Sequence, residues 1–306
     1  MVTTKFLRYF AASGVIVASA IIPAFPAHAS AYPGANGRIV YSSNQTGNYE
    51  LFTASATGAN VRQITRTTTG AEGQAVWSPN GKKIAFTSNR NGNDEIYVAN
   101  ANGTKAVNIT NSPGADAQPN WSPDGKRLVF VSFRNGGLQL WTMNADGTKA
   151  ANLFAGGVQP SFSPDGTKIA FTNSDPGATA STDVYVISAD GTGLTNISND
   201  AGTNSSYASF SPDGTAIAFV SDRSGRDQIW TMSVDGDRPT MITATTGQNI
   251  EPAWSPDATR IVFRSTRSGE SLLYTVKPSG KGVVKVSRGS AARGELPNWQ
   301  PLPRRR

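Results

Sequence analysis

The chain contains no cysteine, and its only histidine is His28. If an N-terminal leader that includes His28 is removed, the remaining protein has neither an imidazole nor a thiol. Ser-His-Asp triads, cysteine nucleophiles, histidine general bases and zinc sites built on His or Cys ligands are then excluded. Without disulfides the fold has to be stabilised by its core, which a chain of this length can bury amply.

Long apolar runs are also scarce. The one candidate, Phe10 to Ile22, follows a basic start and leads to the small residues that end at Ala29. Its 13 residues fall short of the ~20 that a membrane-spanning helix needs, and the pattern is typical of a secretory signal peptide. We therefore expect residues 1–29 to be removed, with Ala31 as the next cleavage position. The mature protein is expected to be extracytoplasmic, periplasmic or secreted, and not membrane-spanning.

The sequence has no concentrated stripe of positive charge. Its formal net charge is +7, of which Lys5 and Arg8 supply two and Arg304–Arg306 supply three, leaving +2 for the body. A nucleic-acid-binding protein normally carries a clustered basic surface. We therefore expect no nucleic-acid partner and interpret residues 304–306 as a solvated basic tail.

The chain does contain one repeated sequence motif, an aromatic residue followed by Ser-Pro-Asp-Gly or a near copy. The copies begin at Trp77, Trp121, Phe162, Phe210 and Trp254, with a truncated one at Trp299. The intervals are 44, 41, 48, 44 and 45 residues. A period of 40 to 50 residues suits one four-stranded blade of a β-propeller.

Each repeat can be divided into four strands. In the repeat that starts at Gln118, we expect strands at 118–121, 127–131, 138–143 and 150–154, with Pro, Asp and Gly in the turns. The repeat that starts at Phe162 has three extra residues within 173–182, which indicates a loop insertion. The first repeat has strands at 37–41, 50–53 and 61–64 but lacks an innermost strand.

The missing strand is supplied by Glu295–Trp299, which we expect to pair with the strand at Ile39. The sequence thus predicts an all-β protein, a six-bladed β-propeller of four-stranded blades over residues 30–303. The ring would be closed by the C-terminal strand completing blade one, which removes the exposed sheet edge of an open array. The leading aromatics are expected to fill the space between blades, and the Asp residues to stabilise turns.

Strand direction puts the second-to-third loops and the blade-to-blade connections on one face. These segments vary in length and sequence, as binding loops on a rigid scaffold do. Two sets of residues meet there and form the candidate partner-binding site: Arg90, Arg134, Arg223 and Arg267 from the loops, and Gln74, Gln118, Gln159, Tyr207 and Glu251, with Glu295 one residue out of register. Such a polar funnel suits a peptide or protein, or a sugar. In the alternative interpretation, the arginines bond loop carbonyls and the glutamines cap the channel backbone.

The repeat also resembles a known family. Trp121–Gly125, Arg127–Ser132 and the strand ending Asn144–Gly147 are similar to the TolB-type (WD40-like) β-propeller repeat, over residues 33–300. The resemblance is to the propeller of TolB without the α/β domain that precedes it there. It implies a six-bladed propeller and, for TolB, a periplasmic partner-binding role with the Tol-Pal envelope complex. Similar repeats form non-catalytic propellers of serine peptidases and occur in polysaccharide lyases.

We therefore predict an exported, non-enzymatic and monomeric propeller that binds a protein or peptide, including envelope components, at its channel mouth. No cofactor is expected, although the sequence leaves open a structural divalent cation in the channel. The alternative is a carbohydrate-binding or carbohydrate-cleaving propeller. In that case Glu251 and Glu295 would be paired carboxylates, and Tyr207 would stack on a sugar or transfer a proton.

Overall fold

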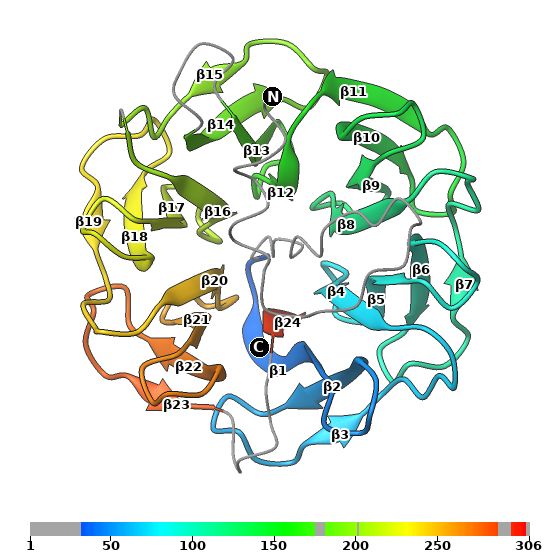
Figure 1. The fold of residues 1–306 in the computed structure, drawn as a ribbon, viewed down its shortest axis with the longest axis horizontal. Coiled ribbons are helices and arrows are strands. Elements are labelled where there is room, and N and C mark those ends of the chain that lie inside the picture. The colour runs from blue at the N-terminus through cyan, green and yellow to red at the C-terminus, as the bar shows by residue number, and fades with distance from the viewer. Residues whose placement is uncertain (1–31, 175–180, 201, 287–294, 304–306) are drawn as a thin grey trace.

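The computed structural model describes residues 32–174, 181–200, 202–286 and 295–303. These residues form β-strands and turns, and none of them belongs to a helix long and apolar enough to cross a membrane. The strands make six four-stranded antiparallel sheets set around a central axis (Figure 1). The prediction of an all-β, six-bladed propeller is confirmed. The expected signal peptide, residues 1–29, and the basic tail, residues 304–306, lie outside the described residues.

From the axis outward, blade one consists of β24 (Glu295–Leu302), β1 (Ala35–Ser43), β2 (Glu50–Ala54) and β3 (Arg62–Gln63). Blade two consists of β4 (Glu72–Trp77), β5 (Lys83–Ser88), β6 (Glu95–Asn100) and β7 (Val107–Asn108). Blade three consists of β8 (Asp116–Trp121), β9 (Arg127–Ser132), β10 (Gln139–Asn144) and β11 (Ala151–Ala155).

Blade four consists of β12 (Val158–Phe162), β13 (Lys168–Ser174), β14 (Thr182–Ser188) and β15 (Thr195–Asn196). Blade five consists of β16 (Ser205–Phe210), β17 (Ala216–Ser221), β18 (Gln228–Ser233) and β19 (Thr240–Met241). Blade six consists of β20 (Asn249–Trp254), β21 (Ile261–Ser265), β22 (Leu272–Val276) and β23 (Val284–Lys285).

The inner strands are apolar along nearly their whole length because each blade packs between two others. In β9 every residue after Arg127 is buried, which matches the continuous run Leu-Val-Phe-Val. A sheet covered on both faces loses the alternation of polar and apolar residues that a half-exposed sheet shows. The outermost strands have neighbours on one edge only, and most are two residues long, shorter than the predicted strand at 61–64.

The turn between the first and second strands is stabilised by its own side chains. In blade three, Ser122 Oγ donates a hydrogen bond of 2.6 Å to Asp124 Oδ1. Asp124 Oδ1 also accepts a hydrogen bond from the Lys126 N–H at 3.0 Å. Gly125 has a φ of 69°, in the left-handed region that favours glycine. The turn role expected for the repeated Asp is therefore present. We call the face that carries these turns the turn face, and the opposite one the loop face.

The leading aromatics lie between blades, as the sequence predicts. Phe162 of blade four is fully buried and packs in one cluster with Val129 and Leu140 of blade three. Its backbone N–H donates to Asn120 Oδ1 of the same neighbour at 3.0 Å. Trp121 occupies the corresponding position between blades two and three. The interfaces between blades therefore repeat around the ring.

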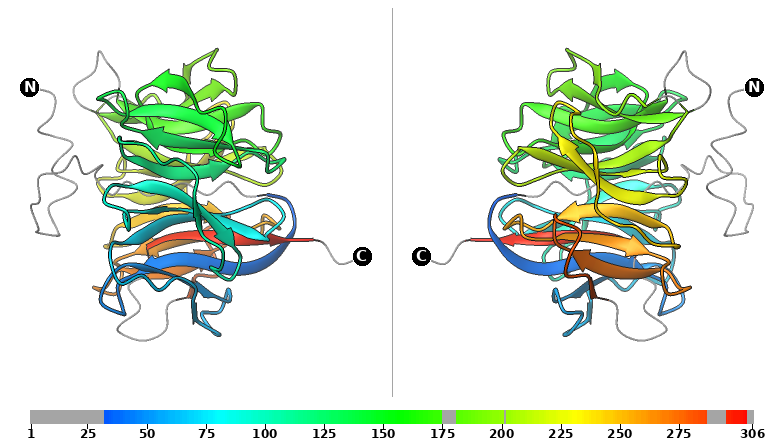
Figure 2. Two further views of the ribbon diagram at one scale, coloured as in Figure 1. Left: turned by 90° about the vertical axis from the view of Figure 1, so that its right-hand side faces the viewer. Right: turned by 90° about the vertical axis from the view of Figure 1, so that its left-hand side faces the viewer.

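The ring is closed by the two ends of the described chain. Ile39 of β1 pairs with Trp299 of β24, as expected, but the pairing continues to Ala35 and Leu302. Strand β24 is thus longer than the predicted segment 295–299, because no turn joins these two strands and ends their ladder. Figure 2 shows both strands extending past the turn face of the disc.

Candidate functional site on the loop face

The residues three positions before each leading aromatic share one unusual backbone conformation. Their φ angles lie between 55° and 60° at Gln74, Gln118, Gln159, Tyr207, Glu251 and Leu296. Each lies at an irregularity in the pairing of the first and second strands. A bulge of this kind redirects a side chain away from the pleat. Leu296 takes this place in blade one, so Glu295 is the residue before it, one position out of register.

The redirected glutamines link blades two to five in series. Gln74 Oε1 accepts the backbone N–H of Gln118 at 3.0 Å, and Gln118 Oε1 accepts that of Gln159 at 2.6 Å. Gln159 Oε1 likewise accepts the N–H of Tyr207 at 3.2 Å. The glutamines thus have the structural role of the alternative interpretation, which is to cap the backbone along the channel. Their role in partner binding stays a prediction.

The four loop arginines are each bound within their own blade. In every case Nε donates to the Ser two residues earlier at 2.9–3.0 Å, and the guanidinium carbon lies 4.4–5.2 Å from the ring of a third-strand aromatic. Nη2 reaches the first strand of the same blade. Its partners there, for Arg90, Arg134, Arg223 and Arg267, are Glu72, Asp116, Ser205 and Asn249. Each guanidinium therefore joins three strands of one blade, and its partner-binding role also stays a prediction.

Blade six departs from this neutral pattern inside the channel. In blades two and four the redirected glutamine accepts from a threonine of the second strand, Thr87 or Thr172, at 2.6–2.7 Å. In blade six the same two positions hold Glu251 and Arg264, and Arg264 Nε donates to Glu251 Oε1 at 2.8 Å. An ion pair thus replaces a neutral hydrogen bond at one place in the ring.

Further ionisable groups surround this ion pair. Glu251 Oε2 accepts the N–H of Leu296 at 2.7 Å, and Tyr49 Oη lies 3.4 Å from Glu295 Oε1. Burial alone would lower the pKa of Arg264, but the carboxylates of Glu251 and Glu295 raise it above its ordinary value. Burial, assisted by Glu251, also raises the pKa of Tyr207. Tyr207, Glu251 and Glu295 are therefore brought into one electrostatic cluster, together with Arg264 and Tyr49, which we call the blade-six cluster.

The sequence pattern did not single out Arg264 or Tyr49. Arg264 nevertheless leaves a signal, because it interrupts an apolar second strand. The corresponding positions in the other blades hold Ser42, Thr87, Val131, Thr172 and Val220. Tyr49 leaves no such signal in the sequence, because its contact is with Glu295, 246 positions away.

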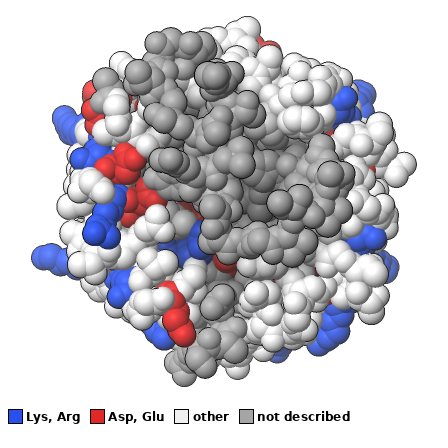
Figure 3. Space-filling model, in the orientation of Figure 1, with Lys and Arg blue, Asp and Glu red and all other residues white. Residues whose placement is uncertain are grey.

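Figure 3 shows the loop face in space-filling form, with acidic atoms gathered over blade five. Asp200 there lies 3.6 Å from Arg223, and Asp222 accepts hydrogen bonds from Asn204 at 2.7 Å. Asp227 is buried and accepts from Gln248 at 3.1 Å. Most charges on this face are thus fixed by neighbours, which gives the mouth a defined pattern of donors and acceptors.

Two carboxyl groups on the loop face, Asp94, which is partly buried, and Asp116, which is fully buried, lie in an environment that disfavours their charged form. Burial raises the pKa of Asp94 to about 6, and the carboxylate of Glu95 adds to the rise. Burial also raises the pKa of Asp116 to about 6, against hydrogen bonds from Ser132 and Arg134. Both groups therefore take up a proton at a higher pH than an exposed aspartate does.

Asp94→Asn is expected to stabilise the protein at pH 8 but not at pH 4. The folded-state pKa of Asp94, about 6, exceeds its ordinary value of 3.8. Its contribution to stability is therefore complete below the lower value and is lost as the pH rises through the higher one. Removing the carboxylate should add about 1 kcal/mol at pH 8, measured by denaturant unfolding at both pH values. Asp165→Asn is the control, because hydrogen bonds lower the pKa of that turn carboxylate and no gain at pH 8 is expected. An equal effect of Asp94→Asn at both pH values would contradict the prediction.

The geometry defines a closed six-bladed propeller whose repeated turns face one side and whose variable loops face the other. The sequence pattern of the TolB β-propeller domain matches residues 67–159 and 152–249, which together make up more than half of the chain. The chain belongs to this family. Comparison with curated protein sequences gives no match.

Solved structures with the same fold have diverse activities. TolB from Acinetobacter baumannii superposes with a TM-score of 0.72 at 21% identity, covering 87% of this chain and 67% of that one. A chain of a nidogen/laminin complex gives 0.67 at 10% identity, covering 86% and 98%. Oligogalacturonate lyase from Vibrio parahaemolyticus gives 0.59 at 14% identity, covering 86% and 79%. At these identities the likeness shows the fold alone.

Proposed function

We propose that this protein is an exported, non-enzymatic propeller that binds a protein or peptide partner at the loop-face mouth of its channel. The proposal rests on the blade-six cluster. At the two positions that Glu251 and Arg264 occupy in blade six, blades two and four have a neutral glutamine that accepts from a threonine, and blade one has Leu296, which has no side-chain acceptor. The fold therefore does not require an ion pair of Glu251 and Arg264, which costs more to desolvate. Its presence therefore favours a role in recognition.

Two further observations support a protein partner. The variable loops and the cluster share one face, so one ligand can contact both. A propeller of the same shape occurs in the nidogen/laminin complex, and the TolB structures belong to the same family. Export is supported by the sequence features of residues 1–29.

Cleavage of a glycan is less well supported. Both carboxylate oxygens of Glu251 are engaged, one by Arg264 and the other by the N–H of Leu296. A general acid or base needs an oxygen free to exchange a proton with the substrate. We therefore expect no release of unsaturated products from polygalacturonate, measured by ultraviolet absorbance. Product release that depends on Glu251 would favour the enzyme instead.

The test converts blade six to the neutral pair of blades two and four. Glu251→Gln combined with Arg264→Thr should preserve the fold, because the same pair already occurs twice in the ring. Protein from the envelope fraction would be captured on the wild type and on the double variant, and each bound protein quantified by mass spectrometry. A partner of the mouth should fall at least about tenfold on the variant, as loss of a desolvated charged contact implies. Lys277→Glu with Lys281→Glu, on the turn face, is the control. Equal capture by a double variant of unchanged melting temperature would refute the proposal.

A further inference from the structure

The turn face carries an excess of positive charge on two neighbouring blades. Six lysines and arginines of blades two and three are exposed in its turns: Lys82, Lys83, Lys105, Lys126, Arg127 and Lys149. Blade two contributes three of them and has Asn80 and Asn102 in its turns. Blade three has Asp124 and Asp146 at the corresponding positions. Blades two and three thus present six cations against two carboxylates.

Blades four to six carry no such excess. The turns of blade four hold Lys168 against Asp165 and Asp190. The turns of blades five and six hold four basic residues (Arg238, Arg260, Lys277 and Lys281) and four acidic ones (Asp213, Asp235, Asp237 and Asp257). Because the turns are built alike in these blades, the fold does not require the difference. The excess of positive charge indicates that an anionic ligand would bind the turn face at blades two and three.

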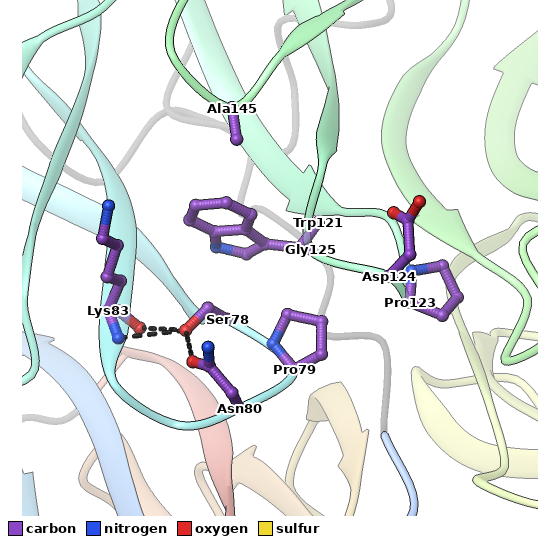
Figure 4. A pocket seen from close by; sticks show the side chains of 9 residues that line it. All are labelled: Ser78, Pro79, Asn80, Lys83, Trp121, Pro123, Asp124, Gly125 and Ala145. Atoms are coloured by element: carbon purple, nitrogen blue, oxygen red, sulfur yellow. Dashed lines mark hydrogen bonds between the residues drawn. The ribbon is translucent and has the colours of Figure 1, made fainter.

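A pocket of about 450 Å³ lies between the turns of these two blades. Figure 4 shows the Trp121 indole across the pocket, with the Lys83 side chain on one side and Pro79 and Pro123 on the other. Ser78, Asn80 and Asp124 add hydroxyl, amide and carboxylate groups to the wall. The volume is within the range of ligand clefts, roughly 300–1,000 Å³.

The lining has the mixed character that a sugar ring needs. The two proline rings offer apolar surface, with the buried Trp121 indole behind them, and the polar groups beside them can bond hydroxyls. Large exposed apolar side chains are few here: among the described residues of blades two and three, only Val107 is one. A membrane-inserting or protein-binding surface would be expected to present more of them.

The turns of neighbouring blades are also close enough to act together. A Cβ placed on Gly125 would lie 3.6 Å from Pro79, and one placed on Gly166 would lie 3.2 Å from Pro123. The cations of blades two and three therefore lie on adjoining turns. Separate charges along adjoining turns match a polymer that carries a charge on successive units.

We propose that the turn face of blades two and three binds an anionic polysaccharide, with one sugar seated in the pocket between their turns. This site is separate from the proposed mouth on the loop face. A protein with both sites would join its partner to a charged glycan on opposite sides of the disc.

Polygalacturonate is the probe, with dextran as the neutral polymer, and binding is measured by calorimetry at low salt and at two higher salt concentrations. Polygalacturonate should bind and dextran should not, and affinity should fall as salt rises because exposed ion pairs are screened. Lys83→Glu with Lys126→Glu should weaken binding at least about tenfold and flatten the salt dependence. Lys277→Glu with Lys281→Glu makes the same charge change on blade six, away from the pocket, and should alter affinity by less than about twofold.

A second variant tests the pocket without changing charge. Ala145 lines the pocket and is partly buried, so Ala145→Leu should fill part of it. A short galacturonate oligomer should then bind several-fold more weakly, with its salt dependence unchanged.

The proposal is overturned if polygalacturonate does not bind, or if both charge-reversed pairs weaken its binding equally. It is also overturned if Glu251→Gln with Arg264→Thr abolishes this binding, or if anionic lipid vesicles or polyglutamate bind more tightly than the glycan.

Discussion

Deleting residues 294–306 should open the ring and leave a protein that aggregates or unfolds at a much lower temperature. The deletion removes β24, the innermost strand of blade one, which contacts three blades. Within blade one, Ile39 loses its partner Trp299. Towards blade two, Asn298 Oδ1 no longer accepts the N–H of Trp77 at 2.9 Å. Towards blade six, Glu251 loses the N–H of Leu296 at 2.7 Å.

The expected loss of stability exceeds about 5 kcal/mol, because removal of a buried tryptophan alone costs ~3–5 kcal/mol and the strand ladder is lost as well. The free edge of β1 would then be available to pair with another chain. Thermal unfolding followed by circular dichroism, together with size-exclusion chromatography, measures both effects. Deleting residues 304–306 alone is the control, since it leaves β24 intact. A monomeric protein with an unchanged melting temperature after the longer deletion would show that the strand does not close the fold.

The architecture could be predicted because the repeat is long, regular and marked by strong turn residues. Ser-Pro-Asp-Gly has the same local effect at each copy, and the spacing from turn to turn counts the blades. The closing strand could be placed because the first repeat lacked the segment that the last one carried in excess. Its full length could not, since it depends on β1 and β24 continuing to pair where no turn limits them.

The candidate site was less predictable, because its contacts join residues that are distant in sequence. Gln118 has no local feature that favours a φ of 58°, yet its conformation places Oε1 on the N–H of Gln159, 41 residues away. The loop position of Arg134 could be predicted, whereas its bond to Asp116 and its place over Trp141 depend on how three strands align. The pairing of Glu251 with Arg264 likewise depends on the bulge that redirects Glu251.

Phe162→Ala is expected to destabilise the folded protein by about 3–5 kcal/mol, the range for removing a large aromatic from a packed core. Phe162 is fully buried in the interface of blades three and four, where it packs in one cluster with Val129 and Leu140. Since the interface packs one sheet against the next, the cavity weakens the contact between two whole sheets. Urea unfolding should show a lower midpoint. The slope should stay the same if the ring still unfolds as one unit.

Phe133→Ala provides the matched control. It removes the same side chain from a residue that packs on the same cluster but is only partly buried. Its cost should stay below about 1.5 kcal/mol, because less apolar surface is re-exposed and water can fill the space. Phe162→Leu should fall between the two, since leucine restores part of the volume. If Phe162→Ala and Phe133→Ala cost the same, the leading aromatics do not hold the blades together. The repeat would then owe its rigidity to the hydrogen bonds along the channel.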